Sequence, residues 1–283
     1  MSRAAKPPPA NPPAAPLPVA PPPGRSLREF ALAELDRAAA QLAREGDARH
    51  AGVHQARKSM RRARATLALA RRALGEAGRR LDEDIARLCR GLSPLRDGQA
   101  LVEALERLQP GAPPALQARL PEAIALAGAR RDALMARALE RDPCLGRRQA
   151  RIEALAARLQ QLPWDEVRNK HVARALGRSE RRVAKARRRV ARDPSHDENW
   201  HVLRRKLRRL RQQDSLLQSL DLAVRPVAGV PLDEATALGE AQDDALLLRH
   251  CGARSPFPAD LRRELRALAR SRLGRVRAAA SGG

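Results

Sequence analysis

The chain has 283 residues, and its 56 Lys and Arg against 32 Asp and Glu give a formal net charge of +24. This excess predicts a polyanionic partner, such as nucleic acid, polyphosphate or an acidic surface. Aromatic residues are only 1% of the chain, which disfavours a protein that stacks single-stranded bases on aromatic rings. No apolar run approaches the roughly 18 residues of a membrane span, so we expect no membrane partner.

The predicted elements are a Pro- and Ala-rich disordered tail over 1–25 and then helices almost throughout. The first helix is expected to begin with Ser26 as its N-cap. A second runs over about 50–74, and Gly75 and Gly78 are expected to break it. Because strand signals are absent, the sequence predicts an all-α protein. The later predicted helices are about 79–90, 94–108, 115–141, 147–161, 165–192, 197–221, 232–250 and 258–279.

One segment occurs twice, as HQARKSMRRAR from His54 and as HVLRRKLRRLR from His201. Both copies read His-x-x-Arg-x-x-x-[basic]-[basic]-x-Arg. Asp97 follows the first His by 43 residues and Asp243 follows the second by 42, and each Asp is expected to cap a helix or bind an arginine. The matched spacing predicts two duplicated units, each a four-helix-type bundle. The predicted halves are 26–143 and 144–283.

On a helix, the basic residues of each copy form a stripe beside the apolar stripe instead of opposite to it. Such side chains line a groove at the edge of the core, where arginines repel one another unless an anion fills the groove. Guanidinium groups also make bidentate contacts with phosphate. The first stripe is His54, Arg57, Arg61 and Arg64, flanked by Lys58 and Arg62. The second is His201, Arg204, Arg208 and Arg211.

The predicted helix 165–192 carries a further basic run, RSERRVAKARRRVAR from Arg178. It precedes the second motif helix across a short turn, so we expect the two helices to pack antiparallel. Its side chains Lys185, Arg188 and Arg189 are then expected to face the same groove.

The sequence predicts no metal site and no other cofactor. His50 and His54 stand four residues apart, a spacing compatible with metal binding, but no third ligand accompanies them. The three cysteines lie far apart without metal-ligand spacing, which predicts buried free thiols in a reducing compartment and hence a cytoplasmic protein.

The paired motifs, together with Arg96-Asp97 ahead of an aliphatic helix, resemble the CHAD family, the conserved histidine α-helical domain. The resemblance covers about 26–279 and implies two similar helical bundles around a basic central channel. It also implies binding of inorganic polyphosphate, often on polyphosphate granules. Lys58 and Arg205 stand where the family often has an apolar residue, and we include both among the expected ligands. The channel residues implied by position are His54, Arg57, Arg61, Arg62, Arg64, His201, Arg204, Arg208 and Arg211.

The principal hypothesis is therefore non-catalytic polyphosphate binding by a cytoplasmic protein on polyphosphate granules. One alternative is nucleic-acid binding, which the net charge equally allows. A second is an enzyme acting on phosphoanhydrides, which would need clustered carboxylates to hold Mg²⁺. No acidic cluster stands on the predicted basic face, so we expect the protein not to be an enzyme.

Overall fold

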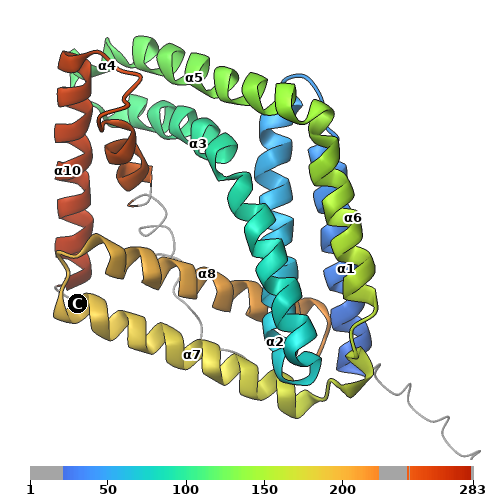
Figure 1. Cartoon of the computed structure of the whole chain (residues 1–283). Helices are drawn as coiled ribbons and strands as arrows, with labels where there is room; N and C mark the ends of the chain where they lie inside the picture. The colour runs from blue at the N-terminus through green and yellow to red at the C-terminus, as the bar shows by residue number, and fades with distance from the viewer. Residues whose placement is uncertain (1–21, 223–240, 242, 282–283) are drawn as a thin grey trace, which may run out of the picture.

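The computed structural model describes residues 22–222, 241 and 243–281, and every regular element in these ranges is a helix (Figure 1). The predicted all-α class is confirmed. Within these ranges no helix combines the length and hydrophobicity needed to cross a membrane. The long helices are α1 Pro23–Leu42, α2 Ala48–Gly91, α3 Ser93–Leu108, α5 Leu120–Arg141, α6 Gly146–Gln160, α7 Asn169–Arg192, α8 Asp197–Ser219 and α10 Ala259–Ser281. The short ones are η1 Gln109–Gly111, α4 Pro114–Gln117, η2 Pro143–Leu145 and η3 Trp164–Glu166.

Two predicted segments lie partly outside the described residues. Most of the expected tail and most of the expected helix 232–250 fall there, although residues 243–250 are helical. Ser26 is not the first N-cap, because α1 already begins at Pro23. The fixed φ of proline suits the first position of a helix, where its missing N–H costs nothing.

The second helix reverses direction at Gly75, which has the backbone angles φ 58° and ψ −146°. A positive φ favours glycine, because any Cβ would be strained there. The predicted break at Gly75 is confirmed, and α2 therefore consists of a 48–74 arm and a 76–91 arm. The predicted break at Gly78 is wrong, because this residue is helical and buried. A Cβ on Gly78 would lie 2.6 Å from the Cβ of Leu74, so close packing accounts for this glycine.

The described helices form two apolar clusters, and neither cluster follows the predicted division into 26–143 and 144–283. The larger cluster joins α1 and α2 to α6, α7 and α8, with Leu35, Met60 and Leu207 among its members. The smaller joins α3 and α5 to α10, as Leu105 and Leu265 illustrate. Each cluster thus combines helices from both halves of the chain.

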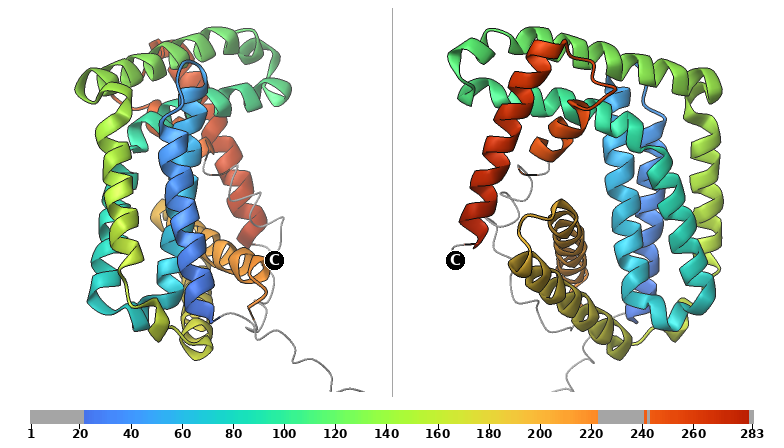
Figure 2. Two further views of the ribbon diagram at one scale, coloured as in Figure 1. Left: turned by 90° about the vertical axis from the view of Figure 1, so that its right-hand side faces the viewer. Right: turned by 60° about the vertical axis from the view of Figure 1, so that its left-hand side comes forward.

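The arrangement of the helices places α2 and α8 at the centre of the larger cluster. Figure 2 shows from two sides that α1, both arms of α2 and α6 lie side by side. The pair α7 and α8 runs antiparallel, as predicted, and packs across α2 (Figure 1). The two helices that carry the repeated motif therefore meet directly.

The cysteines are free thiols, but their predicted burial is only partly confirmed. Cys89 and Cys251 are buried, whereas Cys144 is exposed. Cys144 lies in η2, the short connection between α5 and α6, with a φ of 53°. Connections of this kind run over the protein surface, which accounts for the exposure.

Candidate anion-binding site

A pocket of about 640 Å³ lies between α1, α2 and α8. It is lined by Phe30, Glu34, Arg37, His54, Lys58, Arg61, Arg62, Arg204, Leu207, Arg208, Arg211, Gln212, Ser215, Leu216 and Ser219. Seven of these were expected as ligands: His54, Lys58, Arg61, Arg62, Arg204, Arg208 and Arg211. Both copies of the repeated motif therefore contribute to one pocket.

Packing of the apolar stripes explains how the basic side chains reach this pocket. On α2 the residues Val53 and Met60 are buried, and on α8 Leu203 and Leu210 are buried. The basic stripes stand beside these apolar stripes, so most of their side chains are half-buried at the edge of the core. Arg61, Arg204 and Arg208 consequently line the pocket between the helices.

The centre of the pocket holds like charges in a poorly solvated place. Burial, and next the charge of Arg208, lowers the pKa of Arg61 to about 10. Burial, and next the charge of Arg204, lowers the pKa of Arg208 to about 10. Both groups stay charged at neutral pH, and each raises the electrostatic free energy of the other. An anion in the pocket would relieve this repulsion.

Two further arginines lie against the same cluster of charges. Arg57 donates a hydrogen bond from Nη1 to the backbone carbonyl of Cys89, which holds it behind the pocket lining. Arg96 acts electrostatically on Arg204 and Arg208, and its Nη1 lies 3.4 Å from Asp97. The sequence marked Arg96 only as part of the family resemblance, although it stands one residue before a matched Asp.

A carboxylate that the sequence analysis missed lies inside the pocket lining. The side chain of Glu34 on α1 is 2% exposed, and its Oε1 lies 2.5 Å from Arg37 Nη1 and 2.9 Å from Arg62 Nε. Its Oε2 is buried without a hydrogen-bond partner. Glu34 occupies the apolar stripe of α1 between Ala31 and Ala38, and a charged residue in such a stripe is a readable signal. The pocket therefore contains an internal anion.

The other seven predicted ligands do not line the pocket. Arg205 is exposed with Glu198 3.6 Å away, and His201 is exposed at the start of α8. The α7 residues are exposed as well, because the apolar stripe of α7 faces its neighbours and these side chains project from the other side. The seven are Arg57, Arg64, Lys185, Arg188, Arg189, His201 and Arg205.

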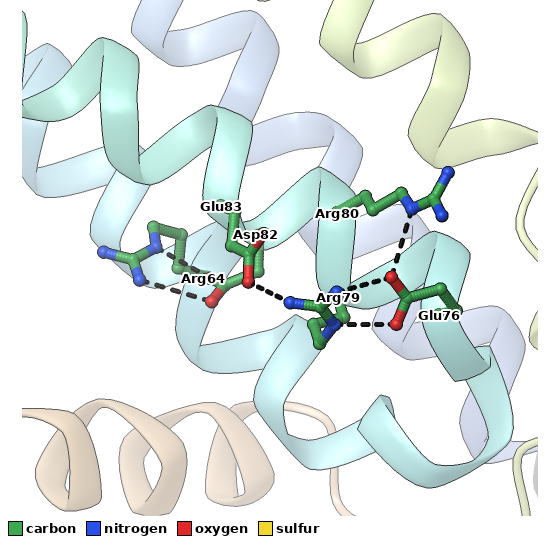
Figure 3. A network of polar contacts seen from close by, with 6 residues as sticks. All are labelled: Arg64, Glu76, Arg79, Arg80, Asp82 and Glu83. Carbon is green, nitrogen blue, oxygen red and sulfur yellow. Dashed lines mark hydrogen bonds and ion pairs between the residues drawn. The ribbon is translucent and has the colours of Figure 1, made fainter.

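Arg64 instead belongs to a network around the reversal of α2, which Figure 3 shows. Its Nε donates to Asp82 Oδ1 at 2.7 Å and its Nη2 to Oδ2 at 3.3 Å. In the same network Arg79 binds Glu76 and Glu83 on the surface, and hydrogen bonds from Arg79 hold the pKa of Glu76 down at about 2. Arg64 thus ties the two arms of α2 together.

The two neighbouring histidines have separate environments. Burial, and next the charge of Arg96, lowers the pKa of His54, while Glu103 opposes this effect. His50 Nε2 lies 3.2 Å from Asp132, away from the pocket lining. Among the described residues, no three His, Cys, Asp or Glu side chains gather closely enough to hold a metal ion.

The fold and the pocket together define an all-helical protein with a cluster of half-buried guanidinium groups. The family model of the CHAD domain matches residues 29–252, so the chain belongs to the CHAD domain family. The crystal structure of the CHAD domain from the plant Ricinus communis is similar with a TM-score of 0.61, at 18% identity over 91% of each chain. PptA from Streptomyces chartreusis is similar with a TM-score of 0.56, at 20% identity over 90% of this chain and 99% of that chain. No curated protein matches the chain.

Proposed function

We propose that the protein binds inorganic polyphosphate, without catalysis, in the pocket between α1, α2 and α8. The observation that carries this proposal is the pair of half-buried, mutually repelling guanidinium groups of Arg61 and Arg208, which line one pocket. Membership of the CHAD family supports the same ligand, because the family resemblance implies polyphosphate binding. On this proposal the pocket is the basic central channel expected from the sequence.

The chemistry of the lining supports a phosphate chain over other anions. Arginines from both helices offer paired donors that match phosphate oxygens. At the end of the pocket nearest the C-terminus of α8, Ser215 offers a hydroxyl donor to the same oxygens, whereas the Ser219 hydroxyl already donates to the Leu216 carbonyl at 2.8 Å. Phe30 is the single Phe, Tyr or Trp among the described lining residues, so the pocket offers few rings on which nucleic-acid bases could stack.

We also infer that α2 and α8 are duplicated elements. The support is that the equivalent motif positions Arg61 on α2 and Arg208 on α8 both line the same pocket. The duplication then concerns the two motif helices and the cleft between them. A duplication of these two helices does not require a separate apolar core in each half of the chain.

A binding role without catalysis agrees with the small number of carboxylates in the pocket. Glu34 is the single carboxylate among the described lining residues, and its Oε1 already faces Arg37 and Arg62. A phosphoanhydride-cleaving enzyme would need free carboxylates for Mg²⁺. We propose, on the family resemblance, that the protein is a cytoplasmic binding component of polyphosphate granules.

Competition between long-chain polyphosphate and double-stranded DNA at two salt concentrations tests the proposal. At equal phosphate concentration polyphosphate should displace DNA, because its charge is denser and the pocket reads only phosphates. The affinity should fall steeply with salt, since bound counterions are released. Equal or tighter DNA binding would transfer the function to the nucleic-acid alternative.

Polyphosphate binding should strengthen as the pH falls from about 7.5 to 5.5, the range in which histidine titrates. The pKa of His54 in the free protein lies below its ordinary 6.5, so the imidazole is neutral at pH 7, and a bound polyanion raises that pKa and causes proton uptake. The gain can reach about tenfold per pH unit for one proton. Titration calorimetry in two buffers of different ionisation enthalpy measures the uptake.

The variant His54→Gln is the control for this pH effect, because it keeps a polar side chain that cannot titrate. It should lose the proton uptake, and an unchanged uptake would assign the effect to another group.

In the ligand-free protein the same lowered pKa of His54 makes acid conditions destabilising instead of favourable. The unfolded chain binds the proton first, so the free energy of unfolding should fall as the pH drops through about 6.5.

A further inference from the structure

The pocket between α1, α2 and α8 has two chemically different ends. The cationic end is lined from both motif copies, by His54, Lys58, Arg61, Arg204 and Arg208. The opposite end, which we call the neutral end, consists of Phe30, Gln212, Ser215, Leu216 and Ser219. We propose that the pocket also binds nucleoside triphosphates, with the triphosphate at the cationic end and the base against Phe30. This inference rests on the proposed function, because the same guanidinium groups hold the phosphates.

The register of the helices places Phe30 at the neutral end. Glu34 on α1 lies 2.9 Å from Arg62 on α2, and these two helices run antiparallel (Figure 2). Phe30 stands one turn before Glu34, so it is level with the residues that follow Arg62 on α2. At this level Gln213 Nε2 of α8 donates to the Ala65 carbonyl at 3.2 Å. Phe30 therefore lies beside the C-terminal half of α8.

Along α8 the positive charges of the lining stop before the neutral end begins. In chain order, the lining residues of α8 are Arg204, Leu207, Arg208, Arg211, Gln212, Ser215, Leu216 and Ser219. At 1.5 Å per residue, Leu216 lies about 12 Å along the helix axis from Arg208. A linear phosphate chain meets guanidinium groups over the first part of this path only. A ligand that also fills the second part needs an apolar surface and groups that form hydrogen bonds.

The neutral end offers both of these features to a nucleobase. Phe30 is half-buried and Leu216 is 3% exposed, so a flat base can pack its face against apolar side chains. The amide of Gln212 and the hydroxyl of Ser215 each donate and accept, as the edge of a base does. An alkyl chain would offer no partner to either group. The volume of about 640 Å³ is in the usual range for a small-molecule site.

One aromatic ring suits a free nucleotide better than a nucleic-acid strand. A strand needs a series of rings on which successive bases stack, and Phe30 is the single Phe, Tyr or Trp in the described lining. In duplex DNA each base is held between its neighbours, so its face is not available to Phe30. The pocket therefore reads only the phosphates of DNA but both parts of a nucleoside triphosphate.

The shared cationic end makes nucleotide and polyphosphate mutually exclusive. Both ligands neutralise the repulsion that the charge of Arg208 exerts on Arg61, and the first to bind removes that gain for the second. ATP should accordingly displace labelled polyphosphate from the protein. The amount of protein on polyphosphate then depends on the concentration of free nucleotides.

The experiment compares ATP with tripolyphosphate, without divalent cations, on the full-length protein and the variant Phe30→Leu. Both ligands carry three linked phosphates, but ATP has one ionisable oxygen fewer, because the ester bond to ribose replaces it. Charge alone predicts weaker binding of ATP, whereas we expect ATP to bind at least as tightly. Phe30→Leu should lower the ATP affinity by about fivefold or more, the low end for one stacked base, and affect tripolyphosphate far less. Weaker wild-type binding of ATP than of tripolyphosphate, or an equal effect of Phe30→Leu on both ligands, would overturn the inference.

Two control variants separate this inference from the proposed function. Leu32→Ala removes a half-buried apolar side chain of α1 outside the pocket lining and should change neither affinity. A loss of ATP affinity equal to that of Phe30→Leu would overturn the contact with Phe30. Arg61→Ala/Arg208→Ala should weaken both ligands strongly, and normal binding of both would mean that the proposed function fails. Loss of both ligands there, without a selective effect of Phe30→Leu, would overturn the inference alone.

Saturation-transfer NMR on the wild type is an independent readout that needs no variant to fold. The adenine protons of ATP should receive saturation from the protein at least as strongly as the ribose protons. The reverse order would place the base in solvent and overturn the inference.

Discussion

Replacing Arg61, Arg204, Arg208 and Arg211 together by Met should reduce polyphosphate affinity by several orders of magnitude. All four line the pocket, and each lost charge-assisted hydrogen bond is worth about 1.5–3 kcal/mol. Met keeps an unbranched apolar stem in place of the arginine stem, so the helices should keep their packing. Fluorescence anisotropy with labelled polyphosphate measures the affinity, and circular dichroism checks the helicity.

The same variant should unfold at a higher temperature than the wild type when no ligand is present. Arg61 and Arg208 repel each other in a poorly solvated place, so apolar replacements remove this repulsion and the cost of keeping the charges partly out of water. In a chain of this length each kcal/mol moves the melting temperature by about 2–4 °C. If the variant is more stable but binds polyphosphate more weakly, these arginines contact the ligand and lower the free energy of unfolding of the ligand-free protein.

The matched control replaces four exposed arginines on other helices by Met, with the same loss of charge. The four are Arg137, Arg151, Arg263 and Arg270. Their replacement should lower the polyphosphate affinity only slightly, because exposed charges act mainly through the screened long-range field. Comparable losses from the two sets would mean that affinity follows net charge alone. The repeated His-Arg pattern would then have only a structural role.

Replacing Glu34 by Gln should weaken the free fold and strengthen polyphosphate binding. Arg37 and Arg62 lose their charged acceptor, which should lower the free energy of unfolding by about 1–3 kcal/mol. The ligand, in turn, no longer competes with an internal carboxylate for these guanidinium groups. Thermal unfolding with and without polyphosphate should therefore show a larger ligand-induced increase in melting temperature in the variant.

The variant Glu76→Gln is the control for Glu34→Gln. Glu76 also accepts from two arginines, Arg79 and Arg80, but it lies on the surface. Exposed ion pairs contribute little to stability, so both stability and binding should change little. Weaker polyphosphate binding by Glu34→Gln would contradict our account and would mean that Glu34 orders Arg37 and Arg62 for the ligand.

The features that could be predicted from the sequence are those that depend on local periodicity. The repeat of apolar residues in α2 and α8 indicated which face of each helix is buried, and the basic stripe beside it indicated the edge of the core. The break at Gly75 was also readable, because a positive φ is a property of the residue itself. These local signals sufficed for the all-α class and for half of the expected pocket residues.

The remaining features depend on how distant helices meet. Glu34 enters the pocket because α1 packs along α2, and no spacing within α1 specifies that contact. The prediction that Lys185, Arg188 and Arg189 share the groove assumed that the basic face of α7 turns inward. In the structure the buried stripe of α7 faces its neighbours, and these three side chains are exposed. The apolar repeat of α7 itself indicates this orientation, so the prediction for these three residues gave too much weight to the basic run.

The exchange of helices between the two apolar clusters has a consequence for synthesis on the ribosome. When α1 and α2 emerge, the α7 and α8 side chains that complete their cluster, such as Val183 and Leu207, are still more than ninety residues beyond the end of α2. Contacts of such high sequence separation slow folding, because a long loop must close before they form. The nascent chain therefore carries an incomplete apolar surface until most of it has been translated, and is a natural client for chaperones during that interval.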